Sequence, residues 1–146
     1  MVTTAQNIIT VQRFMTEVWN KGDMMVIDEI IDLDFKFVLP FVRLESREDF
    51  KKMVTGNRQI FENITYIIDD PEGDIVADET KAASVWTMKS VQVGTWRNIP
   101  ASNKEVILKG MTFFNFNDAG KLKQARVHND LFGMLKQIGG IQELYS

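Results

Sequence analysis

Residues 120–140 read GKLKQARVHNDLFGMLKQIGG, and this pattern predicts a strand that leaves a turn, a short polar cluster and then a helix. Arg126, His128 and Asp130 alternate along the predicted strand, so their side chains should lie on the same side of a sheet. His128 is also the only histidine of the sequence. A polar row of this kind could form a site that takes up and releases protons.

Composition limits the classes of protein to consider. The chain has 146 residues, of which 45% are hydrophobic and 25% charged, as expected for one globular domain spanning residues 1–146. It has no cysteine and one histidine, so we expect no disulfide and no metal site. The net charge of −3 predicts no nucleic-acid partner and no membrane partner. The N-terminus lacks the pattern of a signal peptide, which favours a cytoplasmic protein.

The first half of the sequence shows helical spacing. The first predicted helix follows a capping box at Thr3 and Gln6. Its apolar stripe consists of Ile8, Val11, Met15 and Val18, widened by Phe14 and Trp19. Asp23 can cap a second short helix, and Ser46 with Asp49 can open a third. The apolar side of this third helix consists of Phe50, Met53, Val54 and Phe61. A strand around Phe35, Phe37 and Leu39 separates the second and third helices.

The second half of the sequence changes to a period of two, which is typical of strands. A strand around Ile64 and Tyr66 comes first, followed by turn residues at 70–74. Long strands then cover about residues 82–94 and 106–116, and a loop over residues 97–104 joins them. The pattern predicts an α+β fold in which a curved antiparallel sheet wraps around N-terminal helices.

Several segments together resemble a known family. They are the FMTEVWNKGD run at 14–23, Val85-Trp86-Thr87, the hairpin at 94–104 with Ile99-Pro100, the strand and turn at 110–121, and DLFGMLKQIG at 130–139. In order and spacing, these segments are similar to the SnoaL-like polyketide cyclases, within the nuclear-transport-factor-2-like cone fold. The resemblance spans nearly the whole chain.

The resemblance implies a cone-shaped pocket between the sheet and the helices, often in a homodimer. It also implies an intramolecular aldol cyclisation that needs neither metal nor organic cofactor. The general acid/base of that reaction would be an acidic residue near the end of the last strand, a position that Asp130 occupies here.

The sequence departs from the usual family pattern at four places, one of which is the segment at 70–73, which looks like extra residues. Val38 stands where many relatives have a histidine, and Arg126 stands where an aromatic residue is common. Ser90-Val91-Gln92 replaces a frequent Gly-Thr-His. These differences predict a pocket whose chemistry differs from that of a standard member, and they put a standard aromatic polyketide substrate in question.

Two catalytic residues are predicted, Asp130 and His128. An apolar pocket would raise the pKa of Asp130 and make this carboxyl group a better proton donor and acceptor. His128 could orient the carboxylate or relay a proton. The alternatives are that Asp130 caps the last helix and that His128 lies at the surface or in a dimer interface. An ordinary amphipathic strand would bury Ala125 and Val127, and the whole polar row would then face outward.

Seven residues are predicted to bind a ligand. Arg126 could stabilise an enolate or bind an acidic group, and Gln92 could hydrogen-bond a ligand oxygen. The apolar pocket walls would be Trp86, Met88, Trp96, Met111 and Phe113. The alternatives are packing in the core for the apolar residues, a solvated strand position for Arg126 and exposure at the hairpin end for Gln92.

Three functions are compatible with these residues. The first is cyclase-like or isomerase-like acid/base chemistry on a small apolar carbonyl compound. The second is a ligand-binding or dimeric accessory protein without catalysis, which the missing first-strand histidine favours. The third is hydrolysis of an epoxide, which commonly needs more carboxylates around the attacking water than Asp130 and His128 provide.

Overall fold

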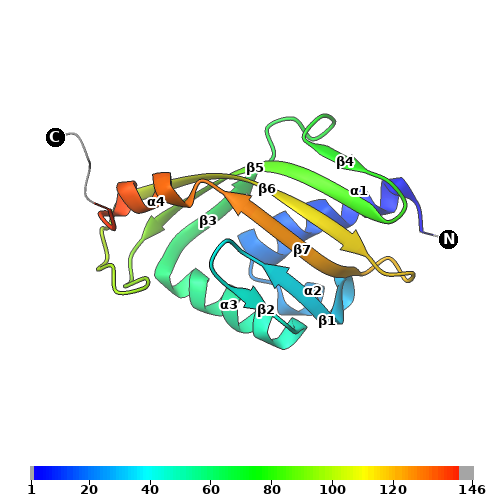
Figure 1. The fold of residues 1–146 in the computed structure, drawn as a ribbon, viewed down its shortest axis with the longest axis horizontal. Coiled ribbons are helices and arrows are strands. Elements are labelled where there is room, and N and C mark those ends of the chain that lie inside the picture. Colours follow the sequence, from blue (N-terminus) through cyan, green and yellow to red (C-terminus); the bar gives the residue numbers. More distant parts are fainter. Residues whose placement is uncertain (1, 142–146) are drawn as a thin grey trace.

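A seven-stranded curved sheet and the helices packed against it form the molecule, which we describe from a computed structural model (Figure 1). The structure describes residues 2–141, so residue 1 and residues 142–146 of the predicted domain lie outside the described residues. The helices, in chain order, are α1 (Thr4–Arg13), the π-helix η1 (Phe14–Asn20), α2 (Met24–Ile30), α3 (Arg47–Ile60) and α4 (Leu131–Ile138). The strands are β1 (Ile31–Val38), β2 (Arg43–Leu44), β3 (Phe61–Ile67), β4 (Ile75–Ala77), β5 (Lys81–Gln92), β6 (Glu105–Phe116) and β7 (Leu122–Asn129).

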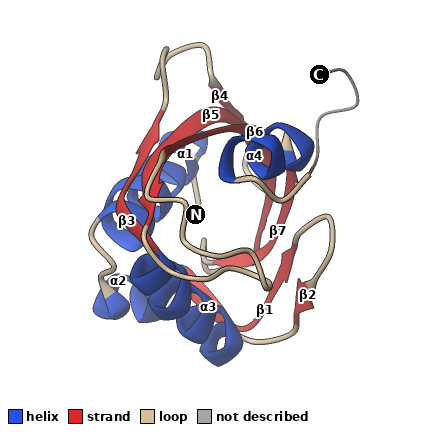
Figure 2. Ribbon diagram, turned by 90° about the vertical axis from the view of Figure 1, so that its left-hand side faces the viewer, coloured by secondary structure: helices blue, strands red, loops and turns tan. Residues whose placement is uncertain are grey.

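The predicted α+β class is confirmed, with one difference in the sheet. Its strand order is β2-β1-β7-β6-β5-β3, and β4 also pairs with β5. All pairs are antiparallel except β1 with β7, so the sheet is mixed. β1 and β7 can pair in parallel because a long connection, which includes α3 and the intervening strands, separates them along the chain. Sequence periodicity does not reveal which strands are neighbours in the sheet. In Figure 2 the strands curve from β3 across β5 and β6 to β7 and β1, and α2 and α3 lie along the open side.

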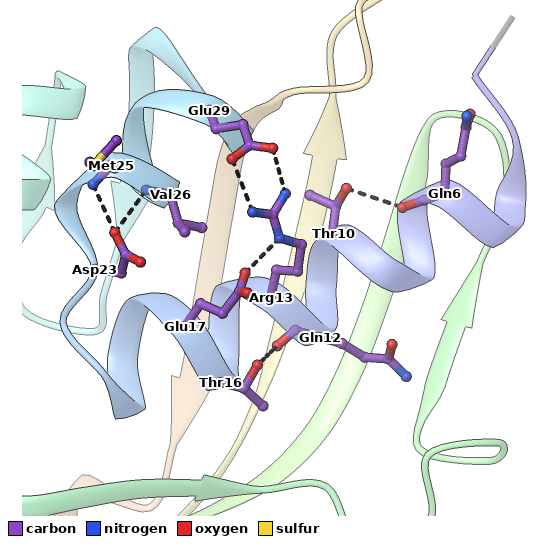
Figure 3. A network of polar contacts seen from close by, with 10 residues as sticks. All are labelled: Gln6, Thr10, Gln12, Arg13, Thr16, Glu17, Asp23, Met25, Val26 and Glu29. Carbon is purple, nitrogen blue, oxygen red and sulfur yellow. Dashed lines mark hydrogen bonds and ion pairs between the residues drawn. The ribbon is translucent and has the colours of Figure 1, made fainter.

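The helix starts follow the capping residues that the sequence provides. The Thr3 hydroxyl accepts the Gln6 amide, and the Gln6 side chain accepts the Thr3 amide, which completes a capping box at α1. Asp23 accepts the amides of Met25 and Val26 at the start of α2, as Figure 3 shows. Ser46 caps α3. These three caps are confirmed, because each depends on side chains within three residues of the helix start.

The first predicted helix changes type at Phe14. Residues 14–20 form a π-helix, with the Asp23 amide donating to the Glu17 carbonyl beyond it at 3.0 Å. A π-helix bonds residues five apart, so it brings Phe14 and Trp19 to the same side, whereas an α-helix would separate them. Arg13, at the junction of α1 and η1, pairs with Glu17 and binds Glu29 of α2 through two guanidinium contacts of 2.9 and 3.0 Å (Figure 3).

A cluster of aromatic rings lies within the aliphatic core between the helices and the sheet. Phe50 of α3 is fully buried, and its ring centroid lies 4.8 Å from that of Phe37 and 5.6 Å from that of Phe14. Phe61, predicted as part of the third helix, is instead the first residue of β3 and buried there. No described helix has the length and apolar character needed to cross a membrane.

Candidate functional site

An interior cavity of about 140 Å³ lies between the π-helix, α3, α4 and the concave face of the sheet. Its aromatic lining consists of Phe14, Trp19, Phe37, Phe41, Phe61, Tyr66, Trp86 and Trp96. The polar residues of its wall are Asn57, Arg97, Thr112 and Asn129, and the remaining lining residues are aliphatic or methionine. No aspartate, glutamate or histidine is among these lining residues.

The cavity owes its shape to two local features of the chain. The π-helix directs Phe14, Met15 and Trp19 into the wall, three residues that lie within six positions. On the sheet, Trp86 of β5 lies opposite Gly110 of β6, and a Cβ at residue 110 would come within 2.6 Å of the Trp86 indole. Only glycine therefore leaves room for this ring. The Trp86 Nε1 then donates to the Thr112 hydroxyl at 2.9 Å in the buried interior.

The polar groups of the cavity are nearly all neutral. The Asn129 Oδ1 is buried and accepts no hydrogen bond from residues 2–141. Desolvation by the surrounding protein raises the pKa of the Tyr66 hydroxyl above its usual range, so this hydroxyl stays protonated at neutral pH. Tyr66 packs against Trp86 with its ring centroid 4.9 Å away. The cavity can therefore offer hydrogen bonds to a ligand, but residues 2–141 contribute no carboxylate or imidazole to its wall that could remove a proton.

The cavity reaches solvent where two loops meet. Phe41 follows β1 and Arg97 lies between β5 and β6; both are exposed and both line the cavity. The Arg97 Cζ lies 4.0 Å from the centroid of the Phe41 ring and 5.6 Å from that of Trp96, within the range of cation–π contacts. We call this contact of Phe41, Trp96 and Arg97 the mouth of the cavity.

Three of the predicted ligand-binding residues line this cavity: Trp86, Met88 and Trp96. Trp86 and Met88 are also buried core residues, so each of them both packs in the core and lines the cavity. Their contact with a ligand stays a prediction.

The other predicted residues of the last strands lie on the outer face of the sheet. Arg126, His128 and Asp130 are exposed. The Arg126 Cζ lies 4.9 Å from the centroid of the Phe113 ring. His128, Asp130 and Met111 share a shallow hollow with Asp69 and Lys109. Trp86 and Asn129 line both this hollow and the interior cavity. The Asp130 Oδ1 accepts the amide of Gly133 at 2.9 Å, so this carboxylate caps α4. The residues that line the interior cavity do not include Arg126, His128, Asp130, Met111 or Phe113.

Gln92 is fully buried and holds the loop that follows β5. Its Nε2 contacts the carbonyls of Gly94, Ile99 and Pro100 at 3.1–3.3 Å, and its Oε1 accepts the amide of Ser102 at 3.1 Å. Gln92 is not among the residues that line the cavity, and the alternative of exposure at the hairpin end does not hold. Its amide stabilises the loop that carries Arg97.

The polar residues of the cavity are the part that reasoning from the sequence missed. The signal for Asn129 was present: Ala125 and Val127 are buried, and Asn129 continues this inward row of β7. The predicted site used the opposite row of the same strand. Tyr66 and Thr112 also alternate with exposed neighbours, but their side chains meet Trp86 only in the folded sheet.

Comparison with known proteins gives the family. The model of the SnoaL-like polyketide cyclases matches residues 9–138. The chain belongs to this family. No curated protein matches the sequence. Within residues 2–141, no group of three or more histidine, cysteine, aspartate or glutamate side chains could hold a metal ion.

Solved structures share the fold of this SnoaL-like chain at low sequence identity. A protein from Jannaschia sp. CCS1, titled SnoaL-like polyketide cyclase, is 19% identical with a TM-score of 0.84, and the alignment covers 96% of each chain. TsrD from Streptomyces laurentii is 23% identical with a TM-score of 0.81, covering 94% of this chain and 97% of that one. An LEH-like epoxide hydrolase of M. tuberculosis is 16% identical with a TM-score of 0.71, and the alignment covers 94% of this chain and 92% of that one. These likenesses show the fold.

Proposed function

We propose that the interior cavity binds one small, largely apolar molecule that donates a hydrogen bond to Asn129. Two observations support this proposal: the buried Asn129 Oδ1 has no hydrogen-bond partner among residues 2–141, and Asn129 is one of the residues that line the cavity. Buried acceptors of this kind favour a donor because leaving them unpaired is costly. A ligand hydroxyl or N–H would supply that donor.

The size of the cavity limits the ligand. An apolar cavity of about 150 Å³ can hold benzene, so a cavity of about 140 Å³ accommodates roughly one six-membered ring. A fused polycyclic molecule would require the walls to move. We therefore expect a monocyclic ligand rather than a polycyclic aromatic polyketide.

The lining favours binding without acid/base catalysis over the aldol chemistry typical of this family. An aldol cyclisation needs a base beside the reacting carbon, and the part of the cavity wall formed by residues 2–141 has no aspartate, glutamate or histidine. Tyr66 and Arg97 are its ionisable residues, and the raised pKa of Tyr66 disfavours the phenolate that could act as a base.

Catalysis by Asp130 and His128 is the second candidate function. The observation in its favour is that both side chains share the outer hollow with Met111. Asp130 would act there as the general acid/base and Arg126 would lie close by on the same face of β7. A substrate would then bind at the outer surface of the sheet.

One binding experiment separates the two sites. Phenol and anisole have the same ring, but only phenol donates a hydrogen bond; calorimetry should therefore show tighter binding of phenol. Asn129→Leu should remove this difference, whereas His128→Leu, on the opposite face of the same strand, should leave it unchanged. Loss of phenol binding in His128→Leu alone would place the ligand in the outer hollow.

The homodimer that the family resemblance implies is a further part of the proposal. The outer face of the sheet carries exposed apolar side chains, including Val85 at 47%, Ile107 at 38% and Met111 at 53% exposure. A second copy of the chain could cover them. Met111→Arg adds charge to this face beside Lys109 and should shift a dimer to the monomer in analytical ultracentrifugation. A monomeric unaltered protein would refute the dimer.

A further inference from the structure

The mouth of the cavity holds a positive charge that the proposed binding of a neutral ring does not use. Arg97 is the one cationic residue of the cavity wall as lined by residues 2–141. It forms no ion pair with any residue of this described part. Its guanidinium rests on the Phe41 ring, with the Cζ 4.0 Å from the ring centroid. One face of the group is therefore covered by an aromatic ring, and within residues 2–141 no ion pair engages its N–H groups, which can bind an acceptor.

The backbone at Arg97 is strained. The Trp96 amide donates to the Ile99 carbonyl at 3.0 Å, and the Ile99 amide donates to the Trp96 carbonyl at 2.8 Å, which closes a two-residue turn. Both central residues, Arg97 and Asn98, have positive φ angles of 49° and 69°. A turn of this pattern prefers asparagine, aspartate or glycine at its first central position, so arginine is an unfavourable choice there. Backbone strain in a binding wall is a reason to look for a function of the side chain.

Hydrogen bonds to the end of β5 and to the end of α3 hold the loop that carries this turn. Gln92, fully buried at the end of β5, hydrogen-bonds three carbonyls of the loop, including that of Ile99 within the turn itself. Gly94 also donates to the Ile60 carbonyl at 3.1 Å, which ties the start of the loop to the end of α3. The position of Arg97 is thus set before a ligand arrives, and this preorganisation lowers the entropy lost on binding.

We propose that the cavity ligand carries a carboxylate and that Arg97 binds this group at the mouth. The planar guanidinium matches the two oxygens of a carboxylate, and such charge-assisted pairs are stronger than neutral hydrogen bonds. The ligand would then be a monocyclic acid with a hydrogen-bond donor at its inner end for Asn129 and the anion at its outer end. This inference rests on the proposed function, because it assigns a second contact to the same ligand.

The test compares acids with their neutral amides on a shared phenol ring. The ligands are 4-hydroxybenzoate, 4-hydroxyphenylacetate and 3-(4-hydroxyphenyl)propanoate, each paired with its amide, with phenol as the reference. The series varies the distance between ring and carboxylate, so it finds the length that reaches Arg97. For the best length we expect the acid to bind about tenfold or more tightly than the amide. Added salt should weaken the acid more than the amide.

Two variants and one matched control identify the residue. Arg97→Gln should remove the preference for the acid, and it should lower the affinity for the acid far more than the affinity for phenol. Arg97→Asn should remove the same preference and also raise the melting temperature, because asparagine suits the positive φ angle. The control is Arg126→Gln, since Arg126 also lies over an aromatic ring but on the outer face of the sheet. It should keep the full preference for the acid.

The outcomes distinguish this inference from the proposed function. If phenol binds but acid and amide bind equally well at all three lengths, the anion site is refuted and the cavity function stands. If neither phenol nor any of the six compounds binds, the proposed function fails and the inference fails with it. If Arg126→Gln rather than Arg97→Gln removes the preference for the acid, the anion binds to the outer face and the assignment to Arg97 is wrong.

Discussion

At the scale of single residues, Asn129 shows how a binding wall costs stability. Its Oδ1 is buried without a hydrogen-bond partner among residues 2–141, so the folded protein carries the cost of removing this oxygen from water. We expect Asn129→Leu, which is similar in size and apolar, to raise the free energy of unfolding by about 1 kcal/mol in urea denaturation. A decrease of similar size would show that the oxygen is satisfied in the unliganded protein and would weaken the case for a ligand donor.

Two substitutions of Asp130 can separate its role as a helix cap from a role in proton transfer. Its carboxylate accepts the Gly133 amide, and asparagine caps helices about as well as aspartate does, whereas alanine does not. Asp130→Ala should therefore lower the free energy of unfolding by about 1 kcal/mol, and Asp130→Asn should change it by only a few tenths. Thermal denaturation of both variants checks this. Equal losses would mean that the charge, rather than the hydrogen bond, stabilises α4.

The same pair of variants also tests the predicted catalytic carboxyl group. Asp130→Asn keeps the cap but cannot exchange a proton at neutral pH, so any turnover that depends on this residue should be lost in a folded protein. Turnover that survives in Asp130→Asn would remove Asp130 from the mechanism, and ligand binding in the interior cavity should be the same in both variants.

At the scale of elements, the loop over residues 93–104 depends on one buried side chain. Gln92→Leu would leave three loop carbonyls and the Ser102 amide without their side-chain partner. We expect the free energy of unfolding to fall by about 1–3 kcal/mol and the Ser102 amide to exchange its hydrogen faster. Helix α3, which Ser46 caps, is a different element, so its backbone amides should keep their hydrogen-exchange rates and serve as the control. Unchanged exchange at Ser102 would contradict the role of Gln92.

The elements differ in how far the sequence predicts them. Helix starts at Thr3, Asp23 and Ser46 are predicted correctly because capping is local. The alternation in β5 is equally local, and its burial pattern follows it. The π-helix is not predicted, because in an ordinary helix Phe14 and Trp19 would lie at the two edges of the apolar stripe and only widen it. What brings them together is their packing against Phe37 and Phe50, rings that come from β1 and α3.

The candidate site also depends on contacts between distant elements, which the sequence does not predict. The period of two in β7 divides its residues correctly into two rows, but the period does not say which row faces a cavity. That choice is decided by the curvature of the sheet and by the helices on its concave side. Gln92 is a similar case, since a polar residue in a strand predicts a hydrogen bond without naming its partner, and the partners lie in the following loop.

At the scale of the whole molecule, ion pairs near the surface join the helices to one another. Asp28 of α2 contacts both Arg47 and Lys51 of α3, and Glu29 contacts Arg13. These carboxylates are half exposed or more, so each pair contributes little alone. Their number still makes the assembly of helices sensitive to acid.

The direction of this pH dependence follows from the pKa shifts. Hydrogen bonds from Lys51 and Arg13 hold the pKa values of Asp28 and Glu29 below their usual range, and backbone amides of Asp34 and Thr80 do the same for Asp32 and Asp78. The folded state therefore binds protons less readily than the unfolded state. The stabilisation is fully present above the ordinary carboxyl pKa values of about 4 and is lost as the pH falls below them.

We therefore expect the melting temperature to be level between about pH 7 and pH 5 and to decrease from about pH 4 downward. Scanning calorimetry at a series of pH values measures this, and Glu29→Gln should make the decrease shallower because one of the depressed groups is gone. Added salt should reduce the difference between neutral and acid pH, since the pairs are exposed to screening. A melting temperature that is the same at pH 7 and pH 3 would mean that packing of the aromatic core alone holds the helices on the sheet.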